Sequence, residues 1–133
     1  MTNPQSVIRA LFGVGTALIV GASAHAAGPA PFPAVSHTYE AKFGAMAFRL
    51  EFNADGKTMR FAEAAAKDFK AVAETVSYTA VPIRAGVYMV YWTEKSGATV
   101  VHVEDFERKI VHTNITNPDR TFYNLSGTWT RVK

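Results

Sequence analysis

The stretch VYMVYWTEKSGATVVHV, residues 87–103, decides the fold. Its first arm, residues 87–94, consists mostly of β-branched and aromatic side chains, which favour the half-buried surface of a strand. Lys95, Ser96 and Gly97 interrupt the run, and glycine adopts the positive φ that tight hairpin turns need. A second arm, residues 98–105, continues with three valines. The stretch therefore predicts a β-hairpin on which the other strands of the chain pack.

Similar segments repeat at short spacing on both sides of this hairpin, each closed by turn residues such as the Asn-Ala-Asp-Gly of residues 53–56. We expect strands at residues 35–43, 45–52, 57–61, 72–81, 87–94, 98–105, 109–115 and 121–132, with the fourth cut by Pro82 and the last bent at Gly127. The alanine-rich residues 62–69 predict one short helical segment. Short strands joined by hairpin-length connections predict an all-β fold, an eight-stranded antiparallel up-and-down β-barrel with room for one small ligand.

The first 26 residues have the pattern of a signal peptide. Residues 10–20 form an unbroken apolar run that is too short to span a bilayer, and Ala24 and Ala26 are small residues at the two positions that a signal peptidase reads. We predict cleavage after Ala26 and a periplasmic or secreted protein, with an uncleaved N-terminal anchor as the alternative. Residues 27–34 contain three prolines and predict a stiff, poorly ordered linker before a barrel domain at residues 35–133.

Charge and composition exclude several classes of function. The chain after Ala26 carries 13 basic and 11 acidic residues, because Arg9 is the one charged residue before it. These charges are interspersed, so we expect no nucleic-acid partner and no membrane insertion after cleavage. The chain has no cysteine, which excludes disulfides, a thiol nucleophile and thiolate metal ligands. His37, His102 and His112 lack the spacing of a metal site, and we expect neither a metal nor another cofactor.

The lining of a pocket depends on which side chains of the hairpin face inward. A two-residue turn at Ser96-Gly97 would set Trp92 opposite Val101, and a following turn at residues 107–108 would set His102 beside Thr113 and Glu104 beside Val111. The predicted interior face then contains Tyr88, Val90, Trp92, Val101, Val103, Ile110 and His112. In that register His102 and Glu104 lie on a solvated outer face. A one-residue slip would exchange the two faces and bury His102 and Glu104 as an acid–base pair.

Residues 86–94, GVYMVYWTE, are followed by a glycine turn and a valine-rich strand, and they resemble the signature of lipocalin-like (calycin) proteins of the MoaF type. The likeness extends over residues 37–133 and implies a calycin barrel with a ligand pocket. Phenolic acid decarboxylases carry a similar stretch, in which a glutamate that acts as the acid directly precedes the glycine. Here that position is Ala85, so the resemblance to this second family does not carry its mechanism.

We expect an exported barrel that binds a small apolar or aromatic molecule. The candidate ligand-binding residues are Phe48, Tyr88, Val90, Trp92, His112 and Trp129. One alternative is a lyase or isomerase that acts on a small aromatic substrate in the same pocket, with Tyr39, Arg49 and His112 as candidate catalytic residues for proton transfer. The other is a structural or interaction protein whose barrel is filled by its own side chains.

Overall fold

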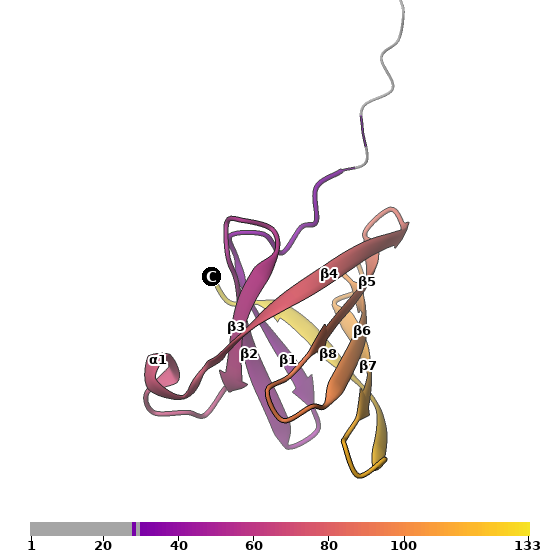
Figure 1. Ribbon diagram of the computed structural model, residues 1–133. Coiled ribbons are helices and arrows are strands. Elements are labelled where there is room, and N and C mark those ends of the chain that lie inside the picture. Colours follow the sequence, from indigo (N-terminus) through magenta and orange to yellow (C-terminus); the bar gives the residue numbers. More distant parts are fainter. Residues whose placement is uncertain (1–27, 29) are drawn as a thin grey trace, which may run out of the picture.

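Eight strands and one short helix make up the computed structural model, which describes residues 28 and 30–133 (Figure 1). The elements are β1 (Thr38–Phe43), β2 (Met46–Phe52), β3 (Thr58–Glu63), α1 (Phe69–Val72), β4 (Glu74–Arg84), β5 (Val87–Thr93), β6 (Thr99–Asp105), β7 (Ile110–Thr116) and β8 (Phe122–Arg131). The predicted signal peptide, residues 1–26, lies outside the described residues. Within the described part of the chain, no helix has the length and apolar character needed to cross a membrane.

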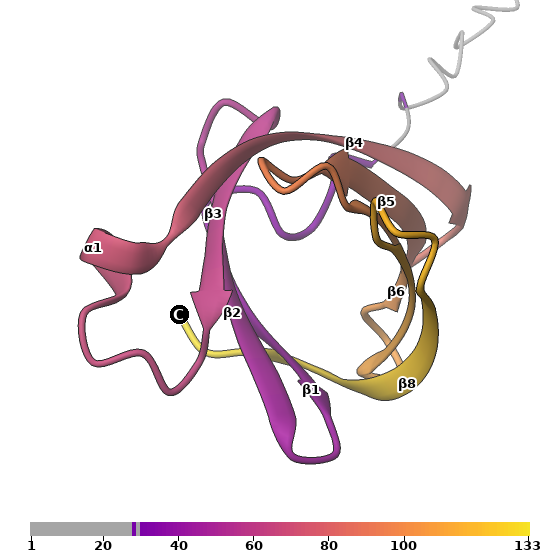
Figure 2. The same cartoon turned by 60° about the horizontal axis from the view of Figure 1, so that its bottom comes forward.

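The strands form a closed ring. Each strand pairs antiparallel with the next one in sequence, and β8 pairs with β1 to complete the barrel (Figure 2). Side chains alternate between the lumen and the solvent, as in β5, where Val90 and Trp92 are buried and Tyr91 is exposed. The prediction of an eight-stranded antiparallel up-and-down barrel is confirmed.

Closure brings the backbones of β1 and β8 into close contact at Gly127. A Cβ atom built on this residue would lie 2.0 Å from the carbonyl oxygen of Lys42, far inside van der Waals contact. The ladder between β1 and β8 ends one residue away, at the pair Lys42 and Thr128. Only glycine therefore allows β8 to pass the end of β1 and close the barrel.

The N-terminal segment fills one end of the barrel. Phe32 inserts among four aromatic rings, with centroids 5.2 to 5.8 Å from its own. These rings belong to Phe52, Tyr78, Tyr88 and Phe106. Stacked and edge-on aromatic contacts of this kind bury large apolar areas. We call this the plugged end of the barrel, and it carries the β2–β3, β4–β5 and β6–β7 turns.

The packing of residues 30–34 against the barrel corrects the expectation of a poorly ordered linker at residues 27–34, of which residues 27 and 29 lie outside the described part of the chain. Ala34 is fully buried, and the hydroxyl of Tyr88 donates a hydrogen bond of 3.1 Å to the carbonyl of Ala30. The prolines stiffen this segment, but they do not prevent Phe32 from packing against the barrel. The aromatic residue between them is what binds the segment.

A second aromatic layer lies next to the plug. Tyr39 stacks on Trp129 with centroids 4.8 Å apart and an interplanar angle of 11°, and the edges of Phe52 and Phe106 pack against this pair. Side chains thus fill the plugged half of the lumen. The other end, which carries the β1–β2, β3–β4, β5–β6 and β7–β8 loops, is the mouth.

Three details of the strand prediction are wrong. The predicted helix at residues 62–69 is displaced, because Ala62 and Glu63 continue the ladder with β2 and so extend β3. The observed helix begins at Phe69, after Asp68 caps it by accepting a hydrogen bond from the amide of Ala71. Pro82 does not end β4, because the register shifts beside it and accommodates the missing donor. The first strand begins at Thr38 rather than at residue 35.

Replacing Gly127 by alanine should destabilise the barrel severely. The added methyl group must displace the backbone of β1 rather than a flexible side chain, so we expect a loss of about 3 kcal/mol or more in the free energy of unfolding. Urea unfolding followed by circular dichroism measures it. Gly28→Ala is the matched control, because nothing lies within 4 Å of that position. Equal stability of the two variants would contradict the close contact at the closing strands.

Candidate functional site

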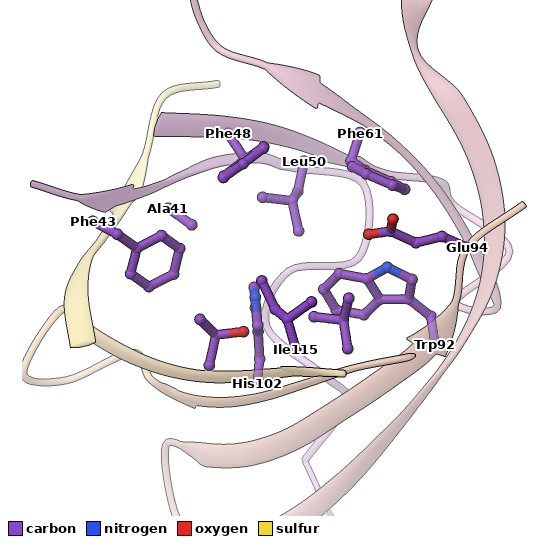
Figure 3. A pocket seen from close by; sticks show the side chains of 11 residues that line it. Ala41, Phe43, Phe48, Leu50, Phe61, Trp92, Glu94, His102 and Ile115 are labelled. Atoms are coloured by element: carbon purple, nitrogen blue, oxygen red, sulfur yellow. The ribbon is translucent and has the colours of Figure 1, made fainter. Parts of the chain in front are cut away.

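A cavity of about 50 Å³ lies in the lumen at the mouth (Figure 3). Its walls are mainly apolar and come from β1, β2, β3, β5, β6 and β7. The lining residues are Ala41, Phe43, Phe48, Leu50, Phe61, Trp92, Glu94, Val100, His102, Thr113 and Ile115. The cavity lies in the half of the lumen away from the plug, where a ligand could enter from the mouth.

The turn between β5 and β6 determines which side chains reach the cavity. The turn has three residues, closed by a hydrogen bond of 2.8 Å from the amide of Glu94 to the carbonyl of Ala98. Gly97 takes a φ of +87° within it. Trp92 therefore lies opposite Val100, and not opposite Val101 as a two-residue turn requires. The predicted register is wrong by one residue, which exchanges the two faces of β6.

The exchanged register buries His102 and Glu104, the acid–base pair that a one-residue slip predicts. The predicted neighbours on β7 are confirmed, with Thr113 opposite His102 and Val111 opposite Glu104. The residues predicted to face inward from β6 and β7, which are Val101, Val103, Ile110 and His112, lie outside the lumen or at its edge.

His102 and Glu104 form a hydrogen-bonded pair inside the barrel. The Nδ1 atom of His102 lies 3.1 Å from Oε1 of Glu104, and the two side chains are 6% and 0% exposed. Burial raises the pKa of Glu104 well above its usual range and lowers the pKa of His102 to about 3. Both shifts favour the neutral forms of the two groups.

Several buried polar atoms around this pair have no hydrogen-bond partner in the described part of the chain. They are Oε2 of Glu104, Oγ1 of Thr113, Nε1 of Trp92, Nε1 of Trp129 and the hydroxyl of Tyr78. A buried polar group without a partner costs about 1–3 kcal/mol. A barrel that served only stability would replace such groups by apolar ones, so their presence marks this region as a candidate site.

Burial also changes the pKa values of two tyrosines in the barrel, Tyr39 and Tyr78. Burial raises the pKa of Tyr78 to about 12, and the carboxylate of Asp55 adds to the shift. Burial also raises the pKa of Tyr39, partly offset by Arg131. Both phenols remain protonated at any physiological pH, so neither is available as a base.

Glu94 is the acidic group of the cavity lining, at the mouth end of β5. Burial and the nearby carboxylate of Glu74 raise the pKa of Glu94, and the hydroxyl of Ser96 and the indole of Trp92 partly offset the shift. In Figure 3 the indole nitrogen of Trp92 points toward the Glu94 carboxylate, although the two groups fall outside hydrogen-bond geometry.

The mouth continues into hollows beside the loop that carries α1. Phe48 and Phe61 line the cavity and also an adjoining hollow of about 450 Å³, whose far side includes Val72 of α1. Phe69 anchors α1 to the outer face of the barrel, where the guanidinium of Arg49 lies 3.8 Å from the centre of its ring. A molecule at the mouth would therefore contact the two phenylalanines and the α1 loop.

Comparison with known proteins places this barrel in a family. A family model described as MoaF-like matches residues 35–130. The chain belongs to the MoaF-like family. It is also similar to a crystal structure from Burkholderia vietnamiensis described as "a putative beta-lactamase", with a TM-score of 0.69 and 28% sequence identity over 78% of this chain and 100% of that one. No curated protein matches the sequence.

This MoaF-like barrel assembles only part of the predicted binding set. Phe48 and Trp92 line the cavity. Val90 and Trp129 are buried in the lumen outside the lining, and Tyr88 lies at the plugged end against Phe32. The prediction that His112 faces inward is wrong, because His112 is exposed and its Nδ1 lies 2.7 Å from the hydroxyl of Ser126.

The predicted catalytic set is not brought together. Tyr39 is in the lumen, but Arg49 lies on the outer face with Glu51 at 3.6 Å, and His112 is outside as well. Ala85, where the decarboxylase acid would stand, is exposed in the β4–β5 turn at the plugged end. His102, Glu104 and Thr113 occupy the interior instead. The alternation of residues along β6 places His102 and Glu104 on one face, and the length of the β5–β6 turn decides whether that face points inward.

Replacing Glu104 by glutamine should stabilise the protein at neutral pH and leave it unchanged near pH 4. Between the usual carboxyl pKa of 4.5 and its raised folded value, the unfolded state releases a proton that the folded state keeps. The stability of the natural protein therefore falls as the pH rises above about 4.5. Glutamine has no such proton to release, and it retains the contact with His102.

Thermal unfolding at pH 4, 6 and 8 measures the difference between the two proteins. His102 loses stability as the pH falls from 6.5 toward about 3, but it is present in both proteins, so its effect cancels in the difference. Glu107→Gln, an exposed position, is the control. A Glu104→Gln variant that is less stable at pH 8 than at pH 4, relative to the natural protein, would show that Glu104 is ionised and stabilising.

Proposed function

We propose that this MoaF-like protein is an exported binding barrel that takes a small apolar or aromatic molecule at its mouth. The observation that carries the proposal is a cavity with apolar walls and a few hydrogen-bonding groups, in a barrel whose other end is plugged by Phe32. Ligand sites in proteins typically combine these features. The aromatic side chains of Trp92, Phe48 and Phe61 supply flat contact surfaces.

The size of the cavity limits what can enter it. At about 50 Å³ it is well below the roughly 300–1,000 Å³ of sites for drug-sized ligands. One small group of the ligand would occupy the cavity, and the rest would lie in the mouth on Phe48 and Phe61. Burying roughly 150–200 Å² of apolar area contributes about 4–5 kcal/mol before the costs of binding, so affinity is modest without polar contacts.

Export is part of this proposal. The pattern of residues 1–26 supports cleavage after Ala26 and a periplasmic or secreted location. The segment that plugs the barrel follows that position, with Ala30, Phe32 and Ala34 in contact with the barrel. Cleavage after Ala26 would therefore keep the plug with the mature protein.

An enzyme in the same lumen is the second candidate, and the buried pair of His102 and Glu104 favours it. The pair lies in the lumen with Tyr39, as a lyase or isomerase with acid–base chemistry would require. The name of the Burkholderia vietnamiensis protein suggests β-lactam hydrolysis. None of the six serines of this chain is followed by lysine three residues later, the pattern of serine β-lactamases. Binding remains the simpler proposal, since a histidine with a pKa of about 3 is a weak base.

Purification from a periplasmic extract tests both parts of the proposal. We expect bacteria that express the full chain to yield a protein whose intact mass matches residues 27–133. Mass spectrometry after denaturation should find a small apolar or aromatic molecule in stoichiometric amount. Phe48→Ala should reduce the retained amount several-fold, because Phe48 lines both the cavity and the adjoining hollow. Met46→Ala, an exposed position on the same strand, should retain it. A protein that keeps residues 1–26 would contradict cleavage after Ala26, a protein absent from the periplasmic extract would contradict export, and an empty protein would contradict stable binding.

A further inference from the structure

Two polar side chains from neighbouring strands face the same small cavity. His102 on β6 and Thr113 on β7 lie directly opposite each other in the ladder, and both line the cavity. The ring of His102 rises from β6 into the cavity in Figure 3. Thr113 is 1% exposed, and its hydroxyl has no partner in the described part of the chain. With the indole nitrogen of Trp92 and the carboxyl group of Glu94, this pair supplies the polar side-chain groups of the cavity lining.

The contact with Glu104 determines which ring nitrogen of His102 carries the proton. Because burial favours the neutral forms of both groups, the hydrogen bond at 3.1 Å joins a carboxylic acid to a neutral imidazole. An acid O–H is the stronger donor and an imidazole nitrogen the stronger acceptor, so Oε1 of Glu104 donates to Nδ1 of His102. The proton of the imidazole is then on Nε2, which becomes a donor. This assignment also explains why Oε2 of Glu104 lacks a partner, because it is a carbonyl-type acceptor, the group that is least costly to leave unpaired.

The residues that line the rest of the cavity disfavour an anionic ligand. No lysine or arginine is among the residues that line the cavity, and Glu94 contributes a carboxyl group at its mouth. An anion in this apolar space would lose its hydration without gaining a positive partner, which is strongly unfavourable. The donors of His102 and Thr113 therefore suit an acceptor that carries no charge.

We propose that the cavity selects a neutral carbonyl group, the ketone or aldehyde end of an apolar molecule, through donated hydrogen bonds from His102 and Thr113. This inference rests on the proposed binding function and names the chemical class of its ligand. Glu104 is a positioning residue, because it acts only by holding the proton of His102 on Nε2. A carbonyl carbon with one small substituent fits the cavity, and the apolar body of the molecule lies across Phe48 and Phe61 at the mouth.

Three naphthalene probes of the same shape test the selection. They are 2-acetylnaphthalene, a ketone; 2-isopropenylnaphthalene, which replaces the carbonyl oxygen by a carbon; and 2-naphthoate, which carries a carboxylate. Dissociation constants come from quenching of tryptophan fluorescence, with calorimetry as a second measurement. We expect the ketone to bind about fivefold more tightly than the alkene, as one or two net hydrogen bonds provide. The carboxylate should bind at least about tenfold more weakly than the ketone.

Thr113→Val tests the assigned donor without threatening the fold, because valine has the shape of threonine and the hydroxyl has no partner among the described residues. This variant should lose most of the ketone's advantage over the alkene while its affinity for the alkene stays the same. Thr116→Val, on the exposed end of β7, should keep the advantage.

The outcomes separate the inference from the function on which it rests. Equal binding of the three probes, tightest binding of the carboxylate, or an undiminished ketone advantage in Thr113→Val would overturn the selection of a carbonyl and leave the binding barrel in place. Failure of all three probes to bind would overturn the proposed function and this inference with it.

Discussion

The three-residue turn at residues 95–97 is the constraint on which the interior of the barrel depends. Its hydrogen bond between Glu94 and Ala98 sets the register of β5 against β6, and the ladder carries that register to β7. His102, Glu104 and Thr113 face the lumen for this reason alone. A turn shorter by one residue would place Val101, Val103 and His112 there instead.

The two halves of the barrel divide stability and chemistry between them. In the plugged half, Phe32 and the stacked pair of Tyr39 and Trp129 fill the lumen, and Gly127 lets the closing strands meet. This packing supplies the burial that a chain without disulfides needs. The mouth half can then carry a cavity and a neutral His102–Glu104 pair, features that cost stability. Their cost is easier to explain by a ligand than by folding.

The alternation of apolar residues was enough to predict the barrel, its strand order and most of its strands, because each strand has one buried face. The inward face of β6 was predicted wrongly, because a two-residue and a three-residue turn both suit the sequence of residues 95–97. The helix was misplaced, since the alanines of residues 62–66 have helical propensity while pairing with β2 draws the first of them into β3. Phe32 was missed because proline-rich composition describes the chain locally and gives no sign of the aromatic surface that receives it.

Burial of the His102–Glu104 pair makes His102 a neutral donor that a protonated Glu104 holds in place inside the barrel. Nuclear magnetic resonance of protein labelled with ¹⁵N in its histidines reads the protonation of each ring nitrogen directly, with the exposed His112 as internal reference. Between about pH 5 and 8, we predict that the His102 ring keeps its proton on Nε2 and does not change its protonation state. An imidazolium in this range, or a proton on Nδ1, would contradict it.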